Sequence, residues 1–158
     1  MLFPTLDFLL FFLVVVAATT PLLRRNRARK YVLVAASYFF YAQWNWRFCF
    51  LLAGSSAVTY LGGLALDAAE SDRDRKTVVA VAVATHLSIL GFFKYFDFAA
   101  TSFNQAFAAL GSGREFPMLE VILPVGISFF TFHGISYLVD VYRRDVGVCR
   151  DFGDILLY

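Results

Sequence analysis

Apolar residues are gathered into long blocks along this chain, and short polar segments separate the blocks. A helix needs about 20 apolar residues to cross roughly 30 Å of hydrocarbon, and the blocks are close to that length. The polar break Asn45–Arg47 separates two of them. The pattern predicts five membrane-spanning helices, which cover Leu2–Thr20, Tyr31–Trp44, Phe48–Leu66, Thr77–Phe96 and Met118–Tyr142.

The stretch Asp97–Gly113 differs from these blocks. It places Phe98, Phe103, Phe107 and Leu110 among small and polar residues. This spacing is typical of a helix with one apolar face, which lies in the membrane interface rather than crossing it. We therefore expect a short interfacial helix between the fourth and fifth spans.

Composition excludes an ordinary soluble domain. Hydrophobic residues make up 59% of the chain and charged residues 16%, and the mean hydropathy is +0.65. A soluble domain is usually about half apolar and about a quarter charged. The predicted fold class is thus all-α: a polytopic transmembrane helical bundle of about five spans plus one interfacial helix, formed by residues 1–158.

The positions of basic residues predict the orientation of this bundle. Five positive side chains lie in Arg24–Lys30, directly after the first span, and the positive-inside rule makes that segment cytoplasmic. The amino terminus is then outside. Alternation of the spans leaves few of the 14 lysines and arginines on the outer side, namely Arg47, Lys94 and Arg114.

Several kinds of site are absent from the sequence pattern. No clustered cysteine and histidine spacing suits a metal, and no glycine-rich loop suits a phosphate. Cys49 and Cys149 are predicted on opposite sides of the bilayer, so no disulfide between them is expected. The basic run Arg24–Lys30 is explained by topology or by anionic lipid, so membrane lipid is an expected partner and nucleic acid is not.

Candidate chemistry gathers in the fifth block. On a helix His133, Ser136, Tyr137 and Asp140 share one face, because steps of three and four residues return to the same side. Asp140 is nevertheless seven residues from His133, roughly 10 Å along the axis at about 1.5 Å per residue. A nucleophilic triad needs hydrogen bonds of about 3 Å, so this helix alone cannot form one.

Close packing and a polar path are the remaining interpretations of the fifth block. Gly126 and Gly134 let neighbouring helices approach, and Pro124 is expected to bend the entry turn. Ionisable groups inside a span face the bundle interior by default. His133 could serve in packing, in lining a substrate path or in catalysis. The candidate path-lining residues are Ser128, His133, Ser136 and Asp140.

Two polar side chains carry structural alternatives. Asp140 lies close in sequence to Arg143 and Arg144, which favours an ion pair at the cytoplasmic end. His86 falls in the middle of the fourth block, where a hydrogen bond to a neighbouring helix is favoured over ligand binding.

Three segments carry a resemblance to a known family. They read "SYFFYAQW" (Ser37–Trp44), "ILGFFKYFDF" (Ile89–Phe98) and "ILPVGISFFTFHGISYLVDVYRRD" (Ile122–Asp145). In order and spacing they resemble the amino-terminal part of the membrane-bound O-acyltransferases. The similarity is greatest to the bacterial branch that serves alginate O-acetylation and teichoic-acid D-alanyl transfer. It covers nearly the whole chain.

The resemblance implies an enzyme of the bacterial inner (cytoplasmic) membrane, with several passes. Such enzymes move an acyl group, acetyl in the alginate branch, through a tunnel to a hydroxyl on the outer side. The donor, acetyl-CoA or an acyl-carrier type, is a substrate, and no bound cofactor is expected. The family's catalytic histidine lies on a later segment. His133 stands where relatives are expected to have glutamate or glutamine, and His86 where asparagine is expected, so neither inherits that role.

The last residues, "RDFGDILLY" (Arg150–Tyr158), resemble the start of a further helix, with Asp151 and Asp154 as helix-start residues. The expectation is that residues 1–158 are the amino-terminal transmembrane part of a larger acyltransferase domain, truncated before the catalytic segment, so that no catalytic residue is expected before Tyr158. Expected partners are the remaining carboxy-terminal part and periplasmic acyl-transfer proteins. The expected acceptor is an exopolysaccharide such as alginate or another envelope glycan. The alternative is a non-catalytic membrane module or remnant that acts in packing or assembly.

Overall fold

The computed structural model describes residues 6–109 and 123–158. All regular structure in these two ranges is helical, which confirms the all-α prediction. The elements are α1 (Leu6–Thr19), the 3-10 turn η1 (Thr20–Leu22), α2 (Asn26–Asn45), α3 (Arg47–Ala68), α4 (Asp72–Ala109), α5 (Ile127–Arg143) and α6 (Phe152–Leu157).

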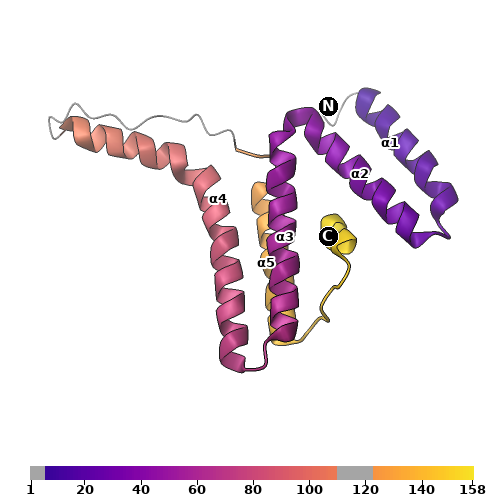
Figure 1. Cartoon of the computed structure of the whole chain (residues 1–158). Coiled ribbons are helices and arrows are strands. Elements are labelled where there is room, and N and C mark those ends of the chain that lie inside the picture. The colour runs from indigo at the N-terminus through magenta and orange to yellow at the C-terminus, as the bar shows by residue number, and fades with distance from the viewer. Residues whose placement is uncertain (1–5, 110–122) are drawn as a thin grey trace.

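The helices form two connected groups (Figure 1). Helices α3, α4 and α5 pack against one another, whereas α1 contacts only α2 and the adjacent turn η1 among the described elements. The short α6 packs on α2 and α3. Successive long helices run in opposite directions, and Figure 1 places the basic segments after α1, between α3 and α4, and after α5 at the lower ends of the helices.

Helix α1 is apolar on all sides and has no buried residue. Leu6 and Leu10 are 84% and 68% exposed. Its contact with α2 is aromatic: the Phe11 ring lies 6.0 Å from Phe39 and 5.8 Å from Phe40, measured between centroids. A helix that is apolar on all sides, and whose side chains are mostly not covered by other helices, is typical of a helix surrounded by lipid.

Two helices are long and apolar enough to cross a membrane by length and composition: α3, and Asp72–Gln105 of α4. Leu6–Leu22 is a shorter apolar helix. These findings support the membrane character of the chain. The predicted total of five spans goes beyond them.

The observed helix boundaries correct several predicted ones. Helix α2 begins at Asn26, five residues before the predicted Tyr31, because lysine, arginine and alanine are good helix formers and continue the helix past the apolar block. At the predicted break Asn45–Arg47, only Trp46 separates α2 from α3. The Asn45 side chain accepts a hydrogen bond from the Arg47 N–H at 3.0 Å, which supports the new helix start.

The predicted interfacial helix is not a separate element. Helix α4 continues without a break from Asp72 to Ala109, past the expected boundary at Phe96. Figure 1 shows that its last part turns away from α3 and α5. The predicted end at Gly113 lies outside the described residues.

Helix α5 begins at Ile127 rather than at the predicted Met118, which is outside the described residues. Gly126 has φ 78°, a left-handed conformation that ends the preceding turn and that glycine adopts without strain. Pro124 therefore precedes the helix instead of bending it, and its carbonyl accepts a hydrogen bond from the Ile127 N–H at 3.2 Å.

Glycines allow the close packing of α3 on α5. A Cβ added to Gly62 would lie 2.7 Å from Cδ2 of Leu138, and one added to Gly63 would lie 3.1 Å from the Tyr137 oxygen. Leu66 and Leu138 are fully buried at this contact. Small residues that bring helix backbones together are the usual basis of helix association in lipid.

Arg75 joins the ends of two helices. Its buried guanidinium donates to the carbonyl oxygens of Leu66 at 2.5 Å, Val141 at 3.0 Å and Tyr142 at 3.0 Å. These carbonyls lie at the carboxyl ends of α3 and α5, where backbone acceptors lack helical partners and the helix dipole is negative. One cation from α4 thus fixes the ends of both neighbours.

Candidate functional site

The four predicted path residues do not form one group. Ser128, His133 and Ser136 line a shallow depression on α5 together with Phe129 and Phe132. Asp140 lines neither this depression nor the cavity described below.

The prediction that Asp140 forms an ion pair with Arg143 or Arg144 is wrong. Arg143 Nε lies 3.4 Å from Asp145 Oδ2 instead, and no ion pair of Asp140 occurs among the described residues. The reason is the helix end: Arg144 has φ 68°, and this left-handed residue turns the chain so that the Asp145 N–H bonds to the Asp140 carbonyl at 2.9 Å. Asp145 is thereby brought back to Arg143.

His133 lies between two aromatic rings. Its imidazole stacks on Phe129 with a centroid distance of 5.5 Å, and on Tyr158 at 3.9 Å. Tyr158 follows α6, so this contact connects the carboxyl end of the chain to the middle of α5.

A cavity of about 220 Å³ lies beside His133, between α2, α3, α5 and α6. We call it the central cavity. Its apolar lining comes from Leu52, Phe129, Phe130 and the segment Ile155–Tyr158. Gly134 also contributes to its wall. Its polar side-chain groups are five hydroxyls and one imidazole, from Ser37, Ser55, Ser56, Thr59, Tyr158 and His133.

His86 is buried directly behind two of these hydroxyls, with 1% of its surface exposed. Its Nδ1 lies 3.3 Å from Ser55 Oγ and its Nε2 lies 3.1 Å from Thr59 Oγ1. The Thr59 hydroxyl donates its hydrogen to the Ser55 carbonyl at 3.0 Å. This confirms the expected hydrogen bond between helices, since His86 is on α4 and both partners are on α3.

Each ring nitrogen of His86 faces one hydroxyl: Nδ1 faces Ser55 Oγ, and Nε2 faces Thr59 Oγ1. A hydroxyl can donate or accept a hydrogen bond, so both tautomers of the imidazole find a partner at each nitrogen.

Gly134 is needed beside this network. A Cβ at this position would lie 2.5 Å from Thr59 Oγ1 and 3.1 Å from His86 Cε1. The prediction of close packing is therefore confirmed for Gly134. It is wrong for Gly126, where an added Cβ would meet no atom of the described residues within 4 Å.

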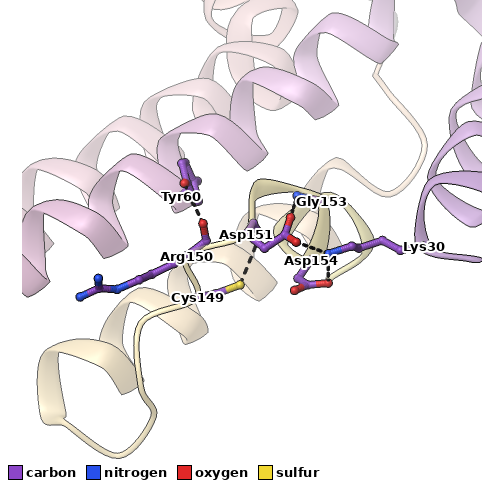
Figure 2. Close-up of polar contacts among 7 residues, drawn as sticks. All are labelled: Lys30, Tyr60, Cys149, Arg150, Asp151, Gly153 and Asp154. Carbon is purple, nitrogen blue, oxygen red and sulfur yellow. Dashed lines mark hydrogen bonds and ion pairs between the residues drawn. The ribbon is translucent and has the colours of Figure 1, made fainter. Parts of the chain in front are cut away.

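The segment that closes the central cavity is fixed by polar contacts (Figure 2). Lys30 pairs with Asp151 and lies 2.9 Å from Asp154. The Asp151 carboxylate also accepts from the Gly153 N–H at 2.9 Å, at the start of α6. The Tyr60 hydroxyl donates to the Arg150 carbonyl at 3.1 Å. Contacts from α2 and α3 thus position α6.

Charge pairing changes the acidity of both partners. The hydrogen bonds to Asp151 and Asp154 raise the pKa of Lys30, and the hydrogen bond to Lys30 lowers the pKa of Asp151. Both groups stay charged at neutral pH, so the contact is a full ion pair there.

The arrangement suits binding more than covalent chemistry. Ser55 and His86 form a serine–histidine pair, but the second nitrogen of His86 faces the Thr59 hydroxyl rather than a carboxylate. A triad relies on an acid at that position to orient the imidazole and to stabilise its cation. Within the described residues no three histidine, cysteine, aspartate or glutamate side chains group as metal ligands.

Sequence reasoning missed Ser55, Thr59 and their connection to His86. One pattern could have indicated them, because the buried residues of α3 recur at helical spacing on one face. They are Ser55, Thr59, Gly62, Gly63 and Leu66. Hydroxyls that share a stripe with packing glycines point toward a neighbouring helix.

Comparison with known proteins identifies homologues of this chain. A protein named probable alginate O-acetylase, from Pseudomonas aeruginosa, is 36% identical over 122 residues, or 77% of this chain and 23% of that protein. A counterpart in Pseudomonas syringae is 37% identical over the same length. A peptidoglycan O-acetyltransferase from Helicobacter pylori is 36% identical over 107 residues, or 68% of this chain and 19% of its own.

The chain spans about a quarter of the length of these relatives. No family profile matches it, and no solved structure matches it. The sequence resemblance to bacterial O-acetylating enzymes is confirmed by the homologues.

Proposed function

We propose, from this homology to the bacterial alginate and peptidoglycan O-acetyltransferases, that the chain is the amino-terminal membrane part of a membrane-bound O-acyltransferase. The enzyme transfers an acyl group, acetyl by similarity, to hydroxyls of an exopolysaccharide such as alginate or of another envelope glycan. Its donor is acetyl-CoA or an acyl-carrier thioester, used as a substrate. The observation that carries the proposal is the similarity over 122 residues, more than three quarters of the chain.

The geometry supports a role as helical framework. A bundle with a polar cavity and tight glycine contacts can form the wall of a substrate path. The path-lining role of Ser128, His133, Ser136 and Asp140 remains part of this proposal, and the central cavity adds Ser55 and Thr59 as candidates. The catalytic histidine belongs to a part of the enzyme outside the described residues.

In this proposal the chain crosses the bacterial inner membrane five times, with its amino terminus outside. The alternating directions of the long helices and the common side of the basic segments support this topology. The remaining part of the enzyme packs against this bundle, and periplasmic acyl-transfer proteins are its partners.

A chimeric enzyme tests the proposed function. In a Pseudomonas aeruginosa strain that lacks its alginate O-acetylase, the gene is restored with the matched segment replaced by this chain. The expected result is acetylated alginate. A chimera that is inserted in the membrane at normal levels but yields only unacetylated polymer would favour the non-catalytic membrane module.

A further inference from the structure

One side of α5 combines exposed aromatic rings with hydroxyls. We call it the exposed face of α5, and it is the shallow depression lined by Ser128, Phe129, Phe132, His133 and Ser136. We propose that this face is covered by a membrane-spanning helix from the remaining part of the enzyme, which presents hydrogen-bonding side chains to the two serines. The inference rests on the proposed function, because its occupant comes from the longer enzyme.

The exposed face lies at the depth of the membrane. Helix α5 packs against α3 and α4, which are both long and apolar enough to cross a membrane. Figure 1 shows α5 running alongside α3. Phe129 and Phe132 are 73% and 57% exposed. Rings exposed at this depth contact either lipid or another helix.

The serine hydroxyls argue against lipid as the occupant. Ser128 and Ser136 make no hydrogen bond within the part of the chain that the structure describes, and lipid tails offer none. A second groove, between α3 and α4, differs in this respect. Its hydroxyls, those of Thr77 and Thr85, donate to carbonyls of their own helix at 3.0 and 2.8 Å. That groove suits lipid, whereas the exposed face of α5 suits a helix with polar side chains.

Two observations favour the rest of the same enzyme as the occupant. The matched segment is only 23% of the Pseudomonas aeruginosa relative, so most of such an enzyme lies outside this chain. Tyr158 stacks on His133, so the residues that follow it in the whole enzyme emerge beside the exposed face. Phe129 and His133 also line the central cavity, so a helix docked here adjoins that cavity.

The oxygen accessibility of two matched positions tests the proposal. Phe132 on the exposed face and Val81 in the groove between α3 and α4 are 57% and 61% exposed. They lie at similar distances from the ends of α4 and α5 that meet at Arg75. Each is changed to cysteine and spin-labelled in the chimeric enzyme, with native cysteines replaced and a single molecule in each nanodisc.

Molecular oxygen concentrates in hydrocarbon, so the collision rate reports contact with lipid. The expected rate at Val81→Cys is at least threefold that at Phe132→Cys. Equal rates at the two positions would overturn the proposal. Protection of Phe132→Cys that requires a second enzyme molecule in the nanodisc would overturn it as well, because another copy would then be the occupant.

A split enzyme measures docking without chemistry. The tagged chain is co-expressed with the remaining part of the Pseudomonas aeruginosa O-acetylase, and the amount of that part that co-purifies is measured. Ser136→Trp obstructs the exposed face and is expected to reduce this amount at least fivefold. Leu61→Trp, in the groove between α3 and α4 and 61% exposed, is expected to leave it unchanged. Equal amounts with both variants would contradict the docking surface.

The acetyl content of alginate separates this proposal from the proposed function. A chimera that acetylates alginate while Phe132→Cys and Val81→Cys are equally accessible to oxygen disproves the docking surface and leaves the proposed function standing. A chimera that protects Phe132→Cys but leaves alginate unacetylated supports the docking surface and counts against the proposed function.

Discussion

At the scale of single residues, buried polar groups fix how the three central helices meet. His86 is satisfied by Ser55 and Thr59, and Gly134 leaves the space that this requires. An unsatisfied polar group in hydrocarbon costs several kcal/mol, so a complete network selects one packing of α3, α4 and α5 over others. His86 therefore specifies how α4 packs against α3.

Substitution of Gly134 tests this packing. Gly134→Ala places a Cβ 2.5 Å from Thr59 Oγ1, and overpacking of this kind costs about 1–3 kcal/mol. In a titration with denaturing detergent, the free energy of unfolding of Gly134→Ala should therefore be lower by that amount. Gly147→Ala is the matched control, because an added Cβ there meets nothing within 4 Å. Equal stability of the two variants would argue against close packing at Gly134.

The ion pair of Lys30 and Asp151 predicts a pH dependence for the docking of α6. Asp151 has its pKa lowered below 3.8 by Lys30. The stabilisation that charged Asp151 gives to the folded state is therefore fully present above pH 3.8. It is lost as the pH falls through the lowered pKa. Lys30 has its pKa raised above 10.5, so its contribution is fully present below 10.5 and is lost as the pH rises through the raised value.

An NMR titration of the Asp151 carboxyl carbon measures this directly. The pKa of Asp151 should lie below 3.8 in the unaltered chain and return toward 3.8 in Lys30→Met, which keeps an apolar stem of similar length. A pKa of Asp151 that Lys30→Met does not change would show that the pair does not form.

At the scale of helices, the apolar blocks predicted which segments are helical but not where the helices end. Ends depend on local chemistry: Gly126 adopts a left-handed conformation before α5, and Asn45 supports the turn before α3. The basic residues before Tyr31 extend α2 because hydropathy and helix propensity are different properties. Position in the membrane therefore does not set the helix boundary.

The candidate site was less predictable than the helices. His133 was identified from its own segment, and its stacking on Tyr158 depends on where α6 docks. The Ser55, Thr59 and His86 network requires knowledge of which faces of α3 and α4 meet. Sequence periodicity gives the buried face of one helix, whereas the pairing of faces is a property of the folded bundle.

The hydrogen bonds of Arg75 predict that this single residue stabilises the packing of both α3 and α5. Hydrogen bonds to charged groups contribute about 1.5–3 kcal/mol, and Arg75→Leu removes three such bonds while leaving the carbonyls of Leu66, Val141 and Tyr142 without this donor. We expect a loss of at least about 1.5 kcal/mol in unfolding free energy. Arg73→Leu, one exposed position two residues away, is the control and should change it little. Similar losses in both variants would indicate a general charge effect.

At the scale of the whole molecule, each basic segment follows the lower end of its own helix in Figure 1. This arrangement predicts opposite exposure for the α2–α3 and α3–α4 turns. In a chain with Cys49 and Cys149 replaced by serine, an impermeant thiol reagent should label Ser71→Cys only from the cytoplasmic side and Arg47→Cys only from the outside. Labelling of both from one side would contradict the topology.

The central claim is that this bundle serves as the framework of a polysaccharide O-acetyltransferase. Its most direct test is the number of O-acetyl groups per sugar residue, measured by NMR on alginate from the chimeric strain. The account predicts acetylation in the chimera and in its Gly147→Leu variant, and at least a tenfold reduction in Gly134→Leu, whose side chain cannot fit against Thr59 and His86. Alginate without acetyl groups from a chimera that is correctly inserted in the membrane would contradict the account.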